Sequence, residues 1–327
     1  MLARIAAVAS VFVAAAACSS SSTTSSEPTA SATSAGAPPA VAPYVDIVSG
    51  TADISAIATA TGQKDYTLAF ILADSSGGCT ATWGGKTALD DSTVAAEIAK
   101  ITALGGTPIV STGGASGTYL ETACTSADDL AAQYEAALDQ AGSNFLDVDI
   151  EQTITPATVV SALSKLQKAK GTSITLTVPV GGTVLGLTDA SIALLTAAEA
   201  ADLDVTINAM TMNFDGGTAD WGTAMTTAGE AVKADVAAVW TDKSDTEIYG
   251  MLGVTPMIGT NDSYATTTIA NATTLRDWAE EKGLAFVRFW SVNRDNNGCT
   301  DGTVSATCSG IAQTEYAFTT LFTKFTT

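Results

Sequence analysis

Histidine is absent from this chain of 327 residues. Without an imidazole, the chain cannot build the Ser-His or Cys-His pairs that activate the nucleophile of triad enzymes. No two of the five cysteines are separated by only two residues, so common zinc-binding patterns are missing too. No glycine-rich nucleotide-binding motif follows the first predicted strand. We therefore expect neither a metal ion nor an organic cofactor.

Positive charge is scarce. Lysine and arginine number 14 against 34 aspartates and glutamates, which leaves a net charge of -20. A nucleic acid or another anionic polymer needs a basic surface, so these partners are excluded and a neutral substrate is expected. Most of the acidity is explained more simply by the solubility that it gives an exported protein.

The apolar run near the amino terminus is too short to span a membrane. It follows the charged start Met1 to Arg4 and ends at Ala17, as expected for a secretory signal in residues 1–17. The sequence around Cys18 resembles a bacterial lipoprotein cleavage site with Cys18 as the lipidated residue. Ala15 departs from the usual leucine, so plain secretion stays open. An exported protein is expected, either secreted or held at the cell surface, with membrane contact only through that lipid.

Bulky apolar side chains are almost missing from residues 18–43, which consist mainly of Ser, Thr, Ala and Pro. Such a segment cannot bury a core and is predicted to be a flexible linker. Residues 44–327 remain as the folded part, which suits one large domain. A monomer is expected.

Four cysteines lie within the folded part, an even number in a chain that we expect to be exported, so two disulfides are predicted. Proximity along the chain favours Cys79 with Cys124 and Cys299 with Cys308. The other two connectivities stay open.

The most informative segment is Asn144 to Gln152, which contains Asp147, Asp149 and Glu151 at alternate positions. In an extended strand these side chains point the same way, at steps of about 7 Å. Mutual repulsion raises the proton affinity of at least one carboxyl, which favours the neutral acid beside an anion that glycoside hydrolysis uses. A solvated edge strand and a calcium site are the alternatives. Both are disfavoured by the predicted helices on either side.

Apolar runs alternate with alanine-rich helical segments through the folded part. Eight strands are predicted, near residues 44–48, 66–72, 107–112, 144–151, 174–180, 205–214, 254–259 and 285–291. Helices are predicted at 93–104, 128–141, 156–170, 191–201, 224–240, 274–282 and 311–325. Eight strands alternating with helices favour a closed (β/α)8 TIM barrel, whose active sites lie at the carboxyl ends of the strands. Glu151 ends the fourth predicted strand.

Several of these motifs resemble those of family-18 chitinases. The fourth-strand pattern of that family appears as Asn144-x-x-Asp147-x-Asp149-x-Glu151, with asparagine in the first place. Its other motifs resemble Ser111-Thr-Gly113-Gly114, Met210-Thr-Met212-Asn213-Phe214-Asp215, and Phe289-Trp290-Ser291. The stretches 253–262 and 290–295 resemble those of secreted actinobacterial chitinases.

The resemblance implies hydrolysis of β-1,4 N-acetylglucosamine linkages in chitin or chito-oligosaccharides, with retention of configuration. It implies that Glu151 protonates the glycosidic oxygen, that Asp149 orients the substrate's N-acetyl group, and that Asp147 holds Asp149. Trp290 would form the floor under the sugar. The other expected substrate-binding residues come from the same motifs: Ser111, Gly113, Met210, Met212, Asn213, Phe214 and Asp215.

The sixth strand departs from the family pattern, because neither possible alignment supplies the tyrosine that contacts the N-acetyl group. Tyr264 or Asn213 could take that role, and otherwise a lowered turnover or a shifted substrate is expected. Trp83 and Trp221 are either outer sugar platforms or ordinary packing residues. An endo-β-N-acetylglucosaminidase acting on N-glycans and a catalytically weak carbohydrate-binding lipoprotein remain alternatives to the chitinase.

Overall fold

The computed structural model describes residues 34–263 and 265–327. The expected signal peptide and lipidation site, and most of the expected linker, lie outside these residues, as does Tyr264. No helix within the described ranges is both long and apolar enough to cross a membrane.

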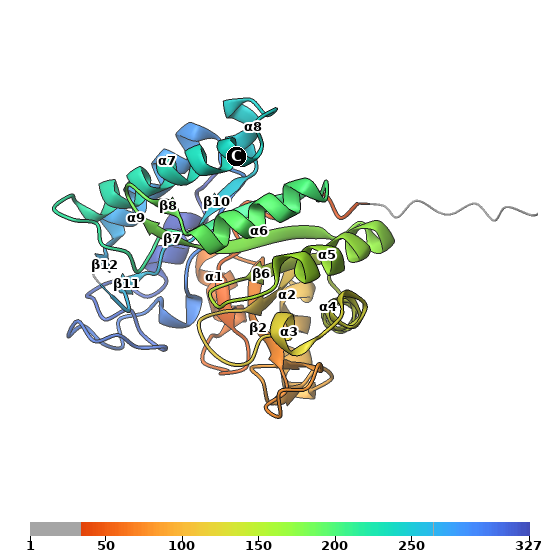
Figure 1. The fold of residues 1–327 in the computed structure, drawn as a ribbon. Coiled ribbons are helices and arrows are strands. Elements are labelled where there is room, and N and C mark those ends of the chain that lie inside the picture. Colours follow the sequence, from red (N-terminus) through yellow and green to blue (C-terminus); the bar gives the residue numbers. More distant parts are fainter. Residues whose placement is uncertain (1–33, 264) are drawn as a thin grey trace, which may run out of the picture. The chain divides into compact units, whose positions relative to one another are not determined.

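Eight parallel strands, with helices outside them (Figure 1), form a closed barrel, as predicted. Each pairs with the next along the chain, and each carries buried apolar side chains typical of strands covered on both faces. In chain order they are β1 (Tyr44–Asp46), β2 (Tyr66–Ala73), β5 (Pro108–Gly113), β6 (Phe145–Asp149), β7 (Ser173–Gly182), β9 (Val205–Met210), β10 (Leu252–Val254) and β13 (Phe286–Val287).

The last strand closes onto the first. The Tyr44 amide donates to the Phe289 carbonyl at 3.1 Å, and the Val287 amide donates to the Ala40 carbonyl at 2.9 Å. Val41 forms a parallel bridge with Val287, and the Ala35 amide bonds the Gly171 carbonyl. The segment from Ala35 to Ala42, which the composition placed in the linker, is therefore held against the barrel by backbone pairing that composition does not reveal.

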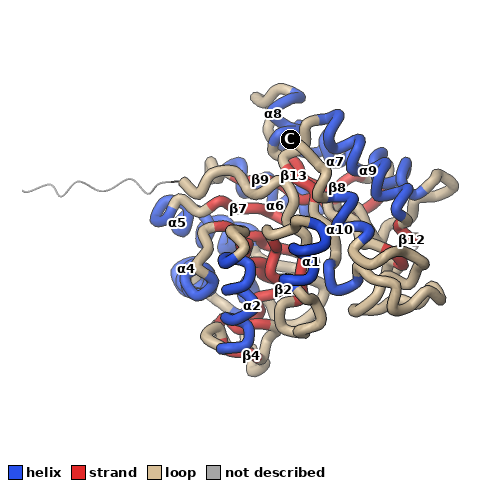
Figure 2. The backbone as a smooth tube through the Cα atoms, turned by 180° about the vertical axis from the view of Figure 1, so that it is seen from behind, coloured by secondary structure: helices blue, strands red, loops and turns tan. Residues whose placement is uncertain are grey.

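Helices surround the strands, which lie at the centre of Figure 2. The barrel helices are α1 (Ile54–Thr61), α2 (Ser92–Ala103), α4 (Ala127–Ala141), α5 (Pro156–Lys170), α6 (Asp189–Ala200), α7 (Trp221–Val239), α9 (Ile269–Lys282) and α10 (Ala317–Phe322). Shorter helices are α3 (Leu120–Ala123), α8 (Asp245–Gly250) and the 3-10 turn η1 (Val292–Arg294). Gly171 and Gly283 end α5 and α9 in the left-handed conformation, as expected for helix C-caps.

Two predicted helix boundaries need correction. Helix α9 begins at Ile269, five residues before the prediction, because Thr268 and Asn271 form a reciprocal capping box. The last helix starts at Ala317 rather than at 311. There the buried Asp295 carboxylate accepts the Phe318 amide, at 3.1 Å, and an amide of the next residue. A long-range contact thus determines where this helix starts.

Short strands extend the barrel at the carboxyl ends of its strands. β3 (Ala81–Trp83) and β4 (Thr87–Ala88) continue the sheet from β2. β8 (Gly186–Leu187) folds back on β7, and β11 (Gly259–Thr260) pairs with β12 (Thr266–Thr267). They lie on the side of the barrel where TIM-barrel enzymes place their active sites.

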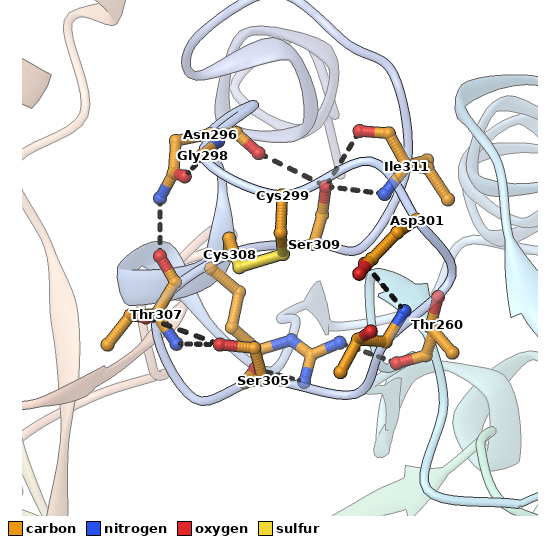
Figure 3. The surroundings of a disulfide bond; sticks show 12 residues. Thr260, Asn296, Gly298, Cys299, Asp301, Ser305, Thr307, Cys308, Ser309 and Ile311 are labelled. Carbon is orange, nitrogen blue, oxygen red and sulfur yellow. Dashed lines mark hydrogen bonds between the residues drawn. A yellow bond between two sulfur atoms is a disulfide. The ribbon is translucent and has the colours of Figure 1, made fainter.

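Both expected disulfides are present, Cys79–Cys124 and Cys299–Cys308. The second closes a loop after β13 that also depends on side-chain to backbone hydrogen bonds (Figure 3). Ser309 donates to the Asn296 carbonyl at 3.1 Å, and Asn296 donates to the Thr307 carbonyl at 2.8 Å. The loop is therefore ordered by a covalent link together with polar contacts.

Candidate functional site

A cavity of about 490 Å³ opens at the carboxyl ends of the barrel strands. Six of the predicted site residues line it: Asp149, Glu151, Met210, Met212, Asn213 and Trp290. Its wall also contains residues that the motifs did not indicate, among them Tyr44, Asp46, Val48, Phe70, Ser116, Thr177 and Asp262. The barrel therefore brings together side chains from all eight of its strands or the loops that follow them.

Asp147 lies beneath the cavity, fully buried inside the barrel. Its Oδ1 accepts from Arg288 Nη1 at 2.9 Å and from Thr177 Oγ1 at 2.6 Å. Its Oδ2 accepts from the Tyr44 hydroxyl at 2.9 Å and from Ser111 Oγ at 2.6 Å. Both oxygens are thus satisfied, and Arg288 compensates the negative charge. Among the described residues, no hydrogen bond joins Asp147 to Asp149, so Asp147 acts on Asp149 through its charge.

Asp149 ends β6 at the bottom of the cavity and is only 4% exposed. Its Oδ1 is buried and has no hydrogen-bond partner among the described residues. Burial raises the pKa of this carboxyl well above its ordinary value, and the charges of Glu151 and Asp147 raise it further. Asp149 lines the cavity, and a carboxyl there can bind a proton and can also accept a hydrogen bond from a ligand.

The Ser111 motif positions this carboxyl without contacting the cavity. Gly113 has φ +89°, and a Cβ there would lie 1.9 Å from the Asp149 carbonyl oxygen, so only glycine fits. The Gly114 amide donates to that same carbonyl at 3.1 Å. Ser111 and Gly113 were expected to bind substrate. Instead, Ser111 bonds Asp147, and Gly113 allows the chain to pass close to the backbone of Asp149.

Glu151 lies two residues beyond the end of β6, where the strand has left the ladder. Its amide donates to the Tyr119 hydroxyl at 3.0 Å, and that hydroxyl donates to the Gly114 carbonyl at 2.5 Å. The surrounding protein raises the pKa of Glu151 to about 7, mainly by desolvation and also through the charge of Asp262. This carboxyl is therefore able to hold a proton near neutral pH.

Asp262 reaches the cavity wall from the loop between β11 and β12. Asn213 donates from Nδ2 to its carboxylate at 3.1 Å and accepts its amide on Oδ1 at 3.0 Å. Asn213 adopts a left-handed backbone with φ 59°, which asparagine tolerates better than most residues. The paired contacts thus join the end of the sixth barrel strand to the loop that contains Asp262.

Aromatic rings form the apolar part of the cavity. The rings of Trp290 and Phe70 are stacked at 5.5 Å between centroids and 15° between planes, and Tyr44 lies 6.0 Å from Trp290. Cis peptide bonds join Ala69 to Phe70 and Trp290 to Ser291. Trp290 is half-buried and lines the cavity, and its role as a platform under a sugar stays a prediction.

Only part of the sixth-strand motif lines the cavity. Met210 and Met212 line the cavity, whereas Phe214 is buried against Trp221 with ring centroids 4.7 Å apart. Asp215 is exposed and accepts the Gly217 amide at 2.8 Å. Neither Phe214 nor Asp215 lines the cavity as predicted, because the backbone turns away after Asn213.

Trp83 and Trp221 pack as ordinary buried residues. Trp83 is fully buried in β3. Trp221 begins α7 and donates from its indole to Thr267 Oγ1 at 2.9 Å. The sequence left open whether these residues are outer sugar platforms or ordinary packing residues, and the structure supports packing for both.

The fold decides against one of the two alternatives for the acidic strand. β6 lies between β5 and β7, so it is not a solvated edge strand. Within residues 34–263 and 265–327, no group of three or more His, Cys, Asp or Glu side chains is arranged to hold a metal ion.

Sequence reasoning missed Arg288, Tyr44, Thr177, Asp262 and Tyr119. One signal was available, since Arg288 is a charged residue between Val287 and Phe289 in a strand predicted to be buried. A buried charge requires a partner, and Asp147 was a candidate. Asp262 gave no comparable signal, because its position depends on how two separate loops pack.

No family model matches the chain. Among curated proteins, it is 30% identical over 310 residues to a probable bifunctional chitinase/lysozyme of Escherichia coli K12, covering 87% of this chain and 34% of that protein. It is also 30% identical over 280 residues to endochitinase 11 of Metarhizium anisopliae, covering 78% of this chain and 52% of that protein. The chain thus spans between a third and about half of these relatives.

The solved structures give matches over the full domain. The catalytic domain of a hyperthermophilic chitinase from Pyrococcus furiosus superposes with a TM-score of 0.79 at 30% identity, covering 88% of this chain and 96% of that one. Catalytic-site mutants of active domain 2 of chitinase from that organism, at 29% identity, have been solved with chito-oligosaccharides. Together with the barrel and its acidic fourth strand, these similarities show that the chain belongs to the chitinase family of glycoside hydrolase family 18.

Proposed function

We propose that this chain is a chitinase that cleaves β-1,4 linkages between N-acetylglucosamine units with retention of configuration. The observation that carries the proposal is the pair Asp149 and Glu151, two carboxyls of raised pKa on one wall of a cavity with an aromatic floor. The chitinase relatives support the same reaction.

Glu151 supplies the proton to the glycosidic oxygen. A pKa of about 7 keeps a useful fraction of this carboxyl protonated near neutral pH, and the resulting carboxylate can then activate water. The Tyr119 hydroxyl fixes the backbone from which Glu151 projects. One residue can thus serve as acid and then as base.

Asp149 orients the N-acetyl group, whose carbonyl oxygen attacks the anomeric carbon in place of a protein nucleophile. The Asp149 carboxyl lines the cavity and is able to accept the N–H of the substrate's amide. As positive charge develops on that group, the neighbouring Asp149 carboxylate stabilises it. The substrate-assisted route retains the configuration of the sugar.

The missing tyrosine of the sixth strand leaves fewer donors for the N-acetyl oxygen. The Tyr44 hydroxyl is engaged with Asp147, and Met210 and Met212 donate no hydrogen bond. Asn213 gives one amide hydrogen to Asp262 and retains a second, so it takes this role at the cavity wall. A slower turnover than in enzymes with the tyrosine follows.

The proposal also includes export of the protein from the cell. Two disulfides in a chain of this size are typical of an extracellular protein. We place the signal in residues 1–17, lipidation at Cys18, a linker after it and the catalytic barrel at the carboxyl-terminal side, acting as a monomer on neutral chito-oligosaccharides.

The test is incubation of the full chain with chitotetraose and chitohexaose, with products detected by mass spectrometry beside Glu151→Gln. Shorter oligosaccharides from the native chain, absent with the variant, are expected, because glutamine keeps the shape but cannot donate the proton. Intact oligosaccharides with both proteins would contradict the proposal. Cleavage of glycoproteins instead would favour an endo-β-N-acetylglucosaminidase, and binding without cleavage would favour a carbohydrate-binding lipoprotein.

A further inference from the structure

The large apolar side chains that are exposed are distributed unevenly over the barrel. Within the described ranges they are Val48, Leu104, Val184, Leu185 and Val304. Val48 follows β1, Val184 and Leu185 connect β7 to β8, and Val304 lies in the disulfide loop after β13. All four follow the carboxyl ends of barrel strands, on the face where the cavity opens, and only Leu104 precedes a strand.

The hairpin of β7 and β8 presents the most exposed pair. Val184 is 94% exposed and Leu185 is 58% exposed, which is unusual for two adjacent aliphatic residues. Full exposure of such side chains stabilises nothing in the domain itself, because no apolar area is removed from water. The pair therefore fits a surface that is covered by something else.

The base of this hairpin is fixed. The Leu187 amide donates to Asp235 of α7 at 2.8 Å. A Cβ on Gly186 would lie 2.2 Å from the same carboxylate and 3.0 Å from the Ala231 backbone, so the strand lies directly on the helix. The tip is thus held out from the barrel on a supported base.

The hairpin is continuous with the cavity. Thr177 lines the cavity and β7 runs on from it to Gly182, about 16 Å along an extended strand. Pro179 of that strand pairs with Met210, which also lines the cavity. A polymer that leaves the cavity on this side meets the hairpin next.

The net charge of the chain limits which kind of partner could cover Val184 and Leu185. The net charge of -20 repels a second copy of the chain and the anionic lipids of a membrane surface. A neutral polymer is not repelled. Chitin exposes acetamido methyl groups and the apolar faces of its sugar rings, which suit aliphatic side chains.

We propose that Val184 and Leu185 form an accessory contact for insoluble chitin, outside the cavity, which holds the polymer surface against the mouth of the barrel. The contact rests on the proposed function for its ligand. It adds affinity for the solid polymer and leaves the cleavage of short soluble oligosaccharides unchanged, because cleavage takes place at Asp149 and Glu151 and not at the hairpin.

The experiment compares the full chain carrying Glu151→Gln, so that the polymer stays intact, with the same chain carrying also Val184→Ser and Leu185→Ser. Leu104→Ser is the matched control, because it removes a similarly exposed aliphatic side chain from the opposite end of the barrel. Binding to chitin powder is measured by depletion from solution. The double substitution is expected to weaken binding about fivefold or more, and the control to leave it unchanged.

Unchanged binding of the double variant, or equal loss in the control, would overturn the proposal. So would a dimer, or binding to phosphatidylcholine vesicles, that the double substitution abolishes. Chitohexaose cleavage is measured separately in chains with Glu151 intact and is expected to be equal in all of them. If the native chain does not cleave chitohexaose, the proposed function is refuted. The accessory contact is still tested, since the binding comparison does not depend on turnover.

Discussion

Asp147 and Glu151 lie four residues apart in one segment, yet their surroundings are opposite. Asp147 is buried within the barrel with both oxygens hydrogen-bonded and with Arg288 as counter-ion. Glu151 faces the cavity, where its pKa is raised to about 7. Two carboxyl groups of one segment thus have different roles. Asp147 stabilises the barrel interior, and Glu151 can exchange a proton in the cavity.

Asp149 lies between these two environments. It is almost as buried as Asp147, yet one of its oxygens has no partner in the described protein. An unsatisfied buried oxygen destabilises the fold, whereas the carboxyl as a whole lines the cavity. Burial therefore does not distinguish Asp147 from Asp149, whereas hydrogen-bond satisfaction distinguishes these two carboxyls.

The largest effect is expected on folding stability, when Asp147 loses its counter-ion. Arg288→Met leaves Asp147 buried without a counter-ion, which should lower the free energy of unfolding by about 3–5 kcal/mol, as measured by urea denaturation. Adding Asp147→Asn to this variant should recover part of the loss, because the buried charge is then removed. A loss below about 1 kcal/mol in the single variant would show that the hydroxyls alone sustain the charge.

Asp149→Asn tests whether the Asp149 carboxyl acts in catalysis rather than in stabilising the fold. We expect kcat to fall about 100-fold, because the developing positive charge loses an anionic neighbour. The unfolding free energy at pH 8 should be equal to or above that of the native chain. A carboxyl whose folded pKa is raised loses stability as pH rises toward that pKa, and asparagine has no such dependence. Strong destabilisation at pH 8 would contradict the distinction between Asp147 and Asp149.

Tyr44→Phe removes one of the four hydrogen bonds to Asp147. The unfolding free energy should fall by about 1.5 kcal/mol, because the bond is to a charged group. Tyr66→Phe is the matched control: this buried hydroxyl donates to the neutral Gln63 carbonyl at 3.3 Å, and its loss should cost less. A smaller loss for Tyr44→Phe than for the control would argue against a charged Asp147.

The smallest effect sharpens the role of the cavity charges. Asp262→Asn removes a negative neighbour that raises the pKa of Glu151, so Glu151 should lose its proton at a lower pH. In a pH profile of kcat/KM, the alkaline limb, expected near pH 7, should move to lower pH. Asp215→Asn, an exposed carboxyl outside the cavity, is the control and should leave the profile unchanged. A shift to higher pH would refute the assignment.

Local pattern was sufficient where the determinants are local. The alternation of Asp147, Asp149 and Glu151 predicted a strand with one acidic side, and eight alternating units predicted the barrel. Gly171 and Gly283 marked helix ends because the left-handed conformation favours glycine. Where long-range contacts decide, the prediction failed, as at the start of the last helix, which depends on Asp295, and at residues 35–42, which pair with β13 and α5.

Composition and periodicity were enough to predict the class of fold, the acidic strand and the absence of histidine chemistry, because both are properties of neighbouring residues. Only the tertiary structure decided which carboxyl is paired and which is left free, since Arg288 and Tyr44 reach Asp147 from the eighth and first strands. It also brought Asp262 toward Glu151 through Asn213. These are contacts between residues more than 45 positions apart in sequence, and their geometry exists only once the barrel has closed.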